Sequence, residues 1–224
     1  MTILYTDPIF LEHDTGGAHP ERRERLLAVS TMLEKSGLMK RCTPGAFEPI
    51  ELASVAKVHA REEIESIQEL ASHGGGYTDP DTVVSPGSFR VALAAAGAGV
   101  AAVDALLSGR DRTALCLVRP PGHHATPQQS MGFCLFNTIA LAARRALDQH
   151  QVNRLLIVDW DVHHGNGTQD IFYADPQVLF YSIHRYGNGF YPGTGAANET
   201  GTGPGLGHTL NMPIAYGTPR RVYH

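Results

Sequence analysis

The sequence predicts an α/β layered domain built on a largely parallel sheet. Short runs rich in Val, Ile and Leu alternate along the chain with longer helical patterns, which is typical of such domains. The chain has 224 residues, of which 42% are hydrophobic and 18% are charged, so it is long enough to bury one large core. No internal repeat or linker interrupts this pattern. We therefore expect residues 1–224 to form a single domain.

The individual elements follow from hydrophobic periodicity between turn residues. Strands are expected over residues 3–5, 114–118, 155–158, 178–183 and 211–214. Helices are expected over residues 21–35, 61–72, 86–107 and 137–150. In the first helix, the side chains expected to face the core are Leu26, Leu27, Val29 and Leu33. The third helix is Ala-rich and contains Asp104, and its apolar part is shorter than the roughly 20 residues that span a bilayer, so we expect it to be buried.

Charge and cysteine content exclude several classes of function. The chain has 18 basic and 22 acidic residues and no run of Lys or Arg, so direct binding to nucleic acid is not expected. Three widely spaced cysteines indicate neither a disulfide framework nor a thiolate zinc site. Asp7 and Pro8 interrupt the first residues, where a leader would be apolar. We expect a protein of the cytoplasm that has no membrane segment.

The most informative stretch is residues 155–167, which reads L-L-I-V-D-W-D-V-H-H-G-N-G. Asp159, Asp161 and His163 stand at alternate positions, and side chains at alternate positions of a strand share one face. Carboxylate and imidazole donors without thiolate suit a catalytic ion such as Zn²⁺ or Fe²⁺. The alternative, a salt-bridged strand end before a glycine turn, is less favourable because paired carboxylates there would lack a cation.

A second strand end, that of residues 114–118, is followed by R-P-P-G-H-H. In open α/β sheets, ligands bind at the carboxyl ends of strands. His123 and His124 are therefore candidate proton-transfer groups, since imidazole titrates near neutral pH. Plain surface histidines are the alternative interpretation.

The third strand end leads into residues 187–207, which contain eight glycines and are long enough for a functional loop. Two aromatic segments, each with a neighbouring glycine, have ring faces suited to a slim aliphatic chain, although core packing explains them equally well. The candidate substrate-binding residues are Gly132, Phe133, Phe190 and Tyr191. A metal, an acid/base pair and a shaped loop together predict metal-assisted hydrolysis.

Four motifs in order carry a resemblance to a known family: R-P-P-G-H-H-A, G-F-C-L-F-N, V-D-W-D-V-H-H-G-N-G-T-Q and F-Y-P-G-T-G. They resemble the zinc-dependent histone deacetylase and acetylpolyamine amidohydrolase superfamily, on its class II side. The resemblance implies an arginase-like three-layer α/β fold. It also implies hydrolysis of N-acetyl amides, with an acetylated lysine peptide or an acetylpolyamine as substrate.

The resemblance also assigns roles to individual residues. It makes Asp161 and His163 ligands of Zn²⁺, and His123 and His124 the general acid/base pair. Asp159 would orient His123. Asn166 stands where many relatives have an aspartate paired to the other histidine, so His124 would be less strongly polarised. A structural K⁺ is implied at Asp159, Asp161, His163, Ser182 and Ile183, and a second K⁺ near Phe172, Asp175 and Val178.

The chain departs from the family pattern in its last part. The segments that carry the family's third zinc ligand, an aspartate, and its transition-state tyrosine do not occur in the 224 residues, and we expect the last strands of the sheet to be missing with them. Catalytic zinc sites ordinarily use three protein ligands, so we expect weak or no activity. The alternatives are an acetyl-ligand binding module and a two-manganese ureohydrolase. The acyl group, the carrier amine and the oligomeric state, a homo-oligomer included, stay open.

Overall fold

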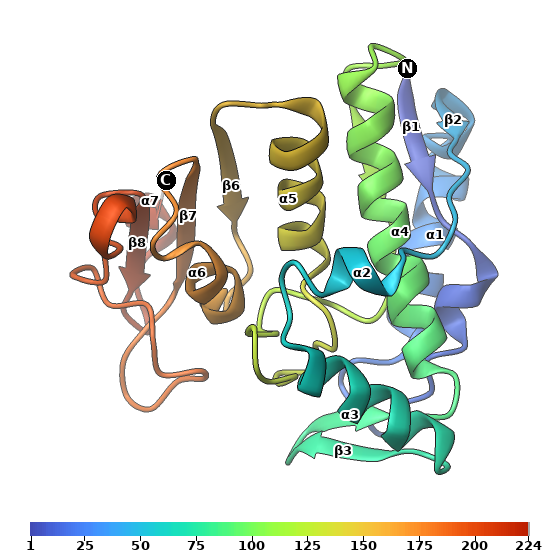
Figure 1. The fold of residues 1–224 in the computed structure, drawn as a ribbon, viewed down its shortest axis with the longest axis horizontal. Helices are drawn as coiled ribbons and strands as arrows, with labels where there is room; N and C mark the ends of the chain where they lie inside the picture. Colours follow the sequence, from blue (N-terminus) through green and yellow to red (C-terminus); the bar gives the residue numbers. More distant parts are fainter. Residues whose placement is uncertain (224) are drawn as a thin grey trace. The chain divides into compact units, whose positions relative to one another are not determined.

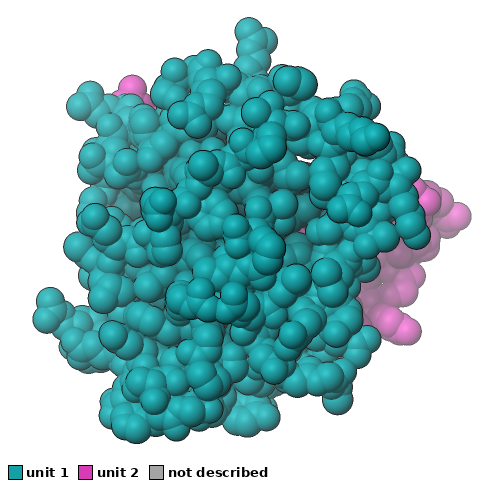
Figure 2. Space-filling model, turned by 90° about the vertical axis from the view of Figure 1, so that its right-hand side faces the viewer, with its two compact units in different colours: residues 1–151 teal, residues 152–224 magenta. Residues whose placement is uncertain are grey.

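The computed structural model describes residues 1–223. The chain divides into two compact units, residues 1–151 and 152–224, which are coloured separately in Figure 2. We refer to them as unit 1 and unit 2. Both are α/β units with parallel sheets, as the sequence predicts. The expectation of a single domain stays a prediction.

Unit 1 contains two sheets and five α-helices (Figure 1). Its strands are β1 (Thr2–Tyr5), β2 (Cys42–Pro44), β3 (Gly76–Asp79), β4 (Thr82–Val84) and β5 (Ala114–Cys116). Its helices are α1 (Arg23–Lys35), α2 (Leu52–Val55), α3 (Arg61–Ser72), α4 (Ser88–Leu107) and α5 (Thr138–His150), with short 3₁₀ turns η1 (Pro8–Leu11) and η2 (Met39–Arg41). The larger sheet is parallel, in the order β2-β1-β5, whereas β3 and β4 form an antiparallel hairpin that the sequence analysis missed.

The core of unit 1 is organised around α4, which lies beside α5 and packs on β1 and β5 (Figure 1). Small side chains let other backbone segments approach α4 closely: a Cβ on Gly97 would overlap the carbonyl oxygen of Glu48. By length and composition α4 could cross a membrane. However, 56% of its apolar 18-residue stretch is buried inside the protein. The prediction of a buried helix is therefore confirmed.

One prediction for α1 is wrong. Leu26 is buried as expected and Leu33 is half-buried, but Leu27 and Val29 are 45% and 40% exposed. The helix contacts the core along a narrow stripe, so only one of the two adjacent leucines can face inward.

Unit 2 is built on a three-stranded parallel sheet in the order β6-β7-β8. Its elements are β6 (Leu155–Asp159), α6 (Asn166–Phe172), β7 (Val178–Arg185), η3 (Gly203–Gly205), β8 (Thr209–Ile214) and α7 (Arg220–Tyr223). The register places Asp159, Ser182 and Asn211 side by side across the three strands. We call residues 187–207 the glycine-rich loop. One face of the sheet is buried under α6 and this loop. The opposite face leaves five apolar side chains exposed: Leu156, Val158, Leu179, Leu210 and Met212.

Candidate active site

His123 and His124 lie in unit 1, on the segment that follows β5. We call residues 119–126 the histidine loop. His124 is buried and His123 is half-buried, and their ring centroids are 4.0 Å apart with a tilt of 42°. The two imidazoles are thus held as a close pair, as the sequence predicts for proton-transfer groups.

The first residue of the histidine loop, Arg119, forms a buried ion pair with Glu21. Its Nε donates to Oε1 of Glu21 at 2.6 Å and its Nη2 donates to Oε2 at 2.7 Å. Its Nη1 donates to the backbone carbonyls of Phe10 and His13, at 3.0 and 3.1 Å. Burial alone would raise the pKa of Glu21, but the hydrogen bonds and charge of Arg119 lower it below its ordinary value.

The other end of the histidine loop is fixed by His59 and Asn137. The side-chain amide nitrogen of Asn137 donates to the backbone carbonyl of Ala125 at 3.2 Å. His59 Nδ1 lies 2.9 Å from the carbonyl of Thr126, and its Nε2 accepts from the backbone N–H of Asn137 at 2.9 Å. Because a carbonyl only accepts, these two bonds require a neutral ring with its proton on Nδ1. Burial is the main cause that lowers the pKa of His59, to about 4, so the ring is neutral near pH 7.

Gly132 and Phe133 form a tight turn in unit 1. Both residues have positive φ angles, 57° and 70°, and such a conformation is uncommon for a bulky side chain. The turn is held because the N–H of Phe133 donates to Oγ1 of Thr82 in β4 at 2.9 Å. The half-buried Phe133 ring packs against His19 in a T-shaped arrangement, with ring centroids 4.7 Å apart. Whether this ring contacts a substrate stays a prediction.

The metal-site residues lie in unit 2, in what we call the acidic turn, residues 159–165. The predicted alternation along a strand is wrong in one respect, because β6 ends at Asp159. Asp161 and His163 instead approach each other through two successive turns: the N–H of Asp161 donates to Asp159 Oδ1 at 3.0 Å, and that of His163 donates to Asp161 Oδ1 at 2.8 Å. Aspartate commonly stabilises such turns by accepting from the backbone two residues on.

The donor atoms of Asp161 and His163 fit part of a zinc site. Oδ1 of Asp161 and Nδ1 of His163 are 3.1 Å apart, a spacing that one ion can bridge with bonds of about 2.0 to 2.2 Å. Among residues 1–223, no group of three or more His, Cys, Asp or Glu side chains is arranged to hold a metal ion. The pair therefore supplies two suitable ligands, and the described chain does not complete the set of three that catalytic zinc uses.

The residues implied for the first potassium site surround the same turn. Asp159 pairs with Ser182 in the register of β6 and β7, and Ile183 follows Ser182. The carboxylate of Asp159 lies against Gly165, where a Cβ would overlap Oδ2. Oγ of Ser182 is 2.9 Å from Nδ1 of His184. The side chains are thus close together, while potassium binding itself stays a prediction.

The second potassium site was predicted where α6 passes into β7. The backbone N–H of Asp175 donates to the carbonyl of Phe172 at 3.0 Å, and Val178 begins β7. These residues form a compact turn, and their binding of an ion stays a prediction.

Aromatic residues of the glycine-rich loop contact the acidic turn. The Phe190 ring stacks on His163, with centroids 5.0 Å apart and planes inclined by 1°, and Tyr191 meets His163 edge-on at 6.1 Å. The guanidinium carbon of Arg185 is 4.2 Å from the centroid of Phe190 and 4.5 Å from that of Tyr216. Sequence reasoning missed Arg185, since its only signal is its position at the end of β7.

A buried polar network lies beneath the glycine-rich loop. His164 Nδ1 is 2.8 Å from Oγ1 of Thr194, and its Nε2 is 3.0 Å from Oε1 of Gln169. Gln169 donates to Glu199 at 2.7 Å, and Glu199 accepts the N–H of Gly195. Burial, and then the nearby His184, lower the pKa of His164 to about 4, so this ring is a neutral structural group. No role was predicted from the sequence for Gln169 or Glu199.

Two predicted contacts join residues of different units: Asp159 with His123, and Asn166 with His124. Within unit 2, Asn166 is buried at the first position of α6, and its N–H donates to the carbonyl of His164 at 2.9 Å. Both pairings stay predictions.

Parallel strands that are followed by paired histidines and by an Asp-His turn define an α/β protein with candidate proton-transfer and metal-binding groups near its strand ends. The histone deacetylase domain profile matches residues 19–224, and the chain belongs to this family. It is 42% identical over 216 residues to a "Probable deacetylase" of Archaeoglobus fulgidus, covering 96% of this chain and 59% of that protein. It is 38% identical over 214 residues to a "Histone deacetylase-like amidohydrolase" of Pseudomonas aeruginosa, covering 96% and 56%.

A solved structure agrees with the fold. The crystal structure of the HDA15 HD domain superposes with a TM-score of 0.91 at 39% identity, covering 95% of this chain and 61% of that one. The prediction of a mixed α/β fold with parallel sheets is therefore confirmed. The chain spans somewhat more than half of the length of these relatives.

Proposed function

We propose that this chain carries the acid/base and part of the metal-binding machinery of an amidohydrolase that removes an acetyl group from the amide nitrogen of a lysine or polyamine. Membership of the histone deacetylase domain family supports an acetylated substrate. The observation that carries the proposal is the convergence of Asp161 Oδ1 and His163 Nδ1 at 3.1 Å, directly beside the stacked ring of Phe190.

The metal, when bound by Asp161 and His163, would polarise the amide carbonyl and lower the pKa of a water molecule. The remaining chemistry belongs to side chains of the chain. One imidazole of the His123–His124 pair takes a proton from the attacking water, and the pair returns a proton to the leaving amine nitrogen. The family resemblance implies that Asp159 would orient His123 and that Asn166 would be the neutral partner of His124.

Substrate binding is assigned to the aromatic residues. Phe190 and Tyr191 contact His163, and Phe133 is presented by a strained turn. Their ring faces suit the methylene chain of an acetyl-lysine or acetylpolyamine, whose charged or peptide end stays in water. K⁺ at Asp159 and Ser182 would help to hold the acidic turn in place.

The test is zinc binding and turnover measured on the same sample. We expect elemental analysis after dialysis against Zn²⁺ to give one zinc per chain, and the Asp161→Asn and His163→Ala variants to lose it. The Glu24→Gln variant, which changes an exposed carboxylate of unit 1, is the control. A wild-type chain that takes up no zinc would contradict the metal assignment.

A binding module is the second candidate, and the incomplete ligand set among residues 1–223 favours it. Calorimetric titration with an acetyl-lysine peptide separates the two candidates when it is run beside a deacetylation assay. Turnover that is lost in His123→Ala, with binding retained, supports the enzyme. Binding without turnover in the wild-type chain supports the module.

A further inference from the structure

Three buried polar side chains that have no role in the proposed chemistry contact the histidine loop or belong to it. Glu21 lies just before α1, His59 lies just before α3, and Arg119 begins the loop itself. All three side chains are buried, with exposed fractions of 1 to 3%. Buried polar groups of this kind are costly unless every hydrogen bond is made, so they hold their partners in one arrangement.

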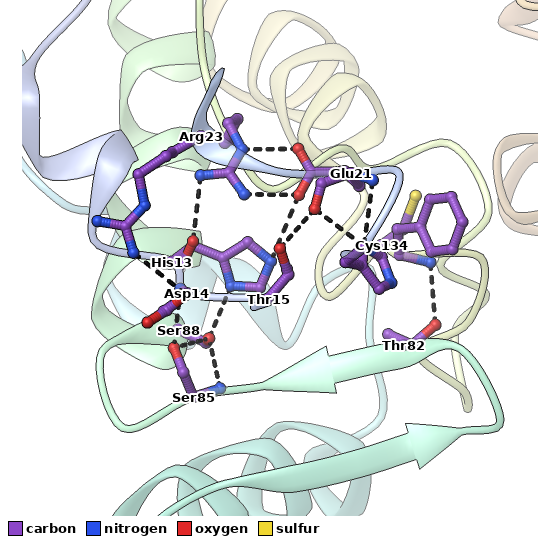
Figure 3. A network of polar contacts seen from close by, with 12 residues as sticks. His13, Asp14, Thr15, Glu21, Arg23, Thr82, Ser85, Ser88 and Cys134 are labelled. Atoms are coloured by element: carbon purple, nitrogen blue, oxygen red, sulfur yellow. Dashed lines mark hydrogen bonds and ion pairs between the residues drawn. The ribbon is translucent and has the colours of Figure 1, made fainter. Parts of the chain in front are cut away.

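The first residue of the loop, Arg119, makes hydrogen bonds to three different residues. Both carboxylate oxygens of Glu21, which is labelled in Figure 3, accept from Arg119, and the third guanidinium nitrogen donates to the carbonyls of Phe10 and His13. Figure 3 also shows His13 extending the network toward Ser88, whose Oγ is 2.7 Å from Nδ1 of His13. A planar guanidinium that makes four such bonds fixes its own backbone in both position and direction.

The middle of the loop has no room to shift toward α5. A Cβ on Gly122 would overlap the backbone of Phe136 and Thr138, so the main chain of the loop packs directly on that of the helix start. At the far end, His59 and Asn137 hold the carbonyls of Thr126 and Ala125. His123 and His124 thus lie between two fixed ends, within a turn that touches backbone on one side.

We infer that Glu21, Arg119 and His59 are positioning residues, which clamp both ends of the histidine loop and thereby set where the His123 and His124 rings stand. This inference rests on the proposed acid/base role of the two histidines. A displacement of a reacting group by about 1 Å costs on the order of 100-fold in rate, so a loosened clamp lowers kcat far more than it changes KM.

The experiment compares Glu21→Gln and His59→Phe with the matched control Asp104→Asn in the full 224-residue chain. Asp104 also takes two hydrogen bonds from one arginine, Arg145, but it joins α4 to α5 without contacting the loop. The readouts are the ring ¹H–¹³C NMR signals of His123 and His124 and the kinetics with an acetyl-lysine peptide. We expect both clamp variants to shift or broaden these ring signals and to lower kcat by roughly 10- to 100-fold with KM within about threefold. Asp104→Asn should change neither.

The double variant Glu21→Leu/Arg119→Met separates positioning from stability, because an apolar pair of similar volume can replace a buried ion pair without loss of stability. We expect its melting temperature to return toward the wild-type value while the ring signals stay displaced. Wild-type ring signals in the double variant or in Glu21→Gln would overturn the inference. If the wild-type chain shows no turnover, the proposed function fails for this chain, and the ring signals alone decide the inference.

Discussion

The histidine loop and the acidic turn both carry histidines, but different kinds of contact hold them. Buried side chains distant in sequence hold the histidine loop, whereas backbone groups of neighbouring residues hold the acidic turn. Arg119 in the histidine loop is fixed by Glu21, which is 98 residues away in sequence, and the pair is buried. In the acidic turn, Asp159 and Asp161 are fixed by backbone groups two residues on, and the side chains of Asp161 and His163 are 49% and 35% exposed.

This difference follows from what each group is proposed to do. A proton-transfer pair has to be oriented before the substrate arrives, and only surrounding structure can do that. Metal ligands that are close in sequence need only local turns to converge, and a bound ion supplies the rest of the order. We therefore expect the two regions to respond differently to substitution.

The largest effect should come from breaking the buried ion pair. Arg119→Met removes the buried partner of Glu21 and leaves the exposed Arg25 as its remaining arginine, and breaking a buried ion pair typically costs about 3 to 5 kcal/mol of unfolding free energy. Lys57→Met is the control, because the Lys57–Asp148 pair is partly exposed and such pairs contribute about 0 to 1 kcal/mol. Urea unfolding followed by circular dichroism measures both. Equal losses in the two variants would contradict the contrast between buried and exposed pairs.

Acid should weaken the protein through its buried histidines. Burial lowers the pKa values of His13 and His59 to about 4, whereas an unfolded histidine titrates near pH 6.5. The unfolded state therefore binds more protons below pH 6.5, and stability falls as the pH drops from about 6.5 to 4, by about 3 kcal/mol for each ring.

The variant that sharpens this pH prediction is His59→Phe, which removes one titrating ring. The unfolding free energy of this variant should depend less steeply on pH between 6.5 and 4 than that of the wild-type chain. The difference in slope should equal the contribution of one titrating histidine. Denaturation curves at half-unit pH steps give the slope. An unchanged slope would show that His59 is not buried in its neutral form.

Within the acidic turn, the tightest point is Gly165. Its φ is −77°, which alanine can adopt, so the effect of Gly165→Ala comes from the clash of the new Cβ with Asp159. We expect a cost of about 1 to 3 kcal/mol in stability and weaker cation binding, measured by thermal unfolding with and without K⁺. Gly17→Ala is the control, because nothing lies within 4 Å of its Cβ position.

The smallest effect is expected where Arg185 stacks on Phe190 and Tyr216. Arg185 is half-buried, and Arg185→Gln removes a cation–π contact of a kind that contributes about 0.5 to 1 kcal/mol at exposed sites and about 2 kcal/mol when desolvated. The readout is peptide affinity from calorimetry, with the exposed Arg154→Gln as control. A loss of the size expected for Arg119→Met would mean that the acidic turn also depends on distant groups.

Local patterns in the sequence predicted most elements within two residues. Helix α3 has the predicted bounds, and α5 begins one residue after Asn137, whose side chain caps it by accepting from Ala140. The hairpin of β3 and β4 was missed because each strand is only three or four residues long, too short to show a hydrophobic period. The convergence of Asp161 with His163 was also predictable, since both donors lie within one turn.

The sequence by itself determined the fold class, the family and the residue types at both strand ends, because these depend on periodicity and on motifs of adjacent residues. Tertiary structure alone decided which buried groups hold the histidine loop: Glu21 pairs with Arg119, and His59 pairs with Asn137. Such pairs join segments far apart in the chain. Their hydrogen bonds become favourable only when folding removes water from both partners. A local sequence pattern therefore does not predict which residues pair.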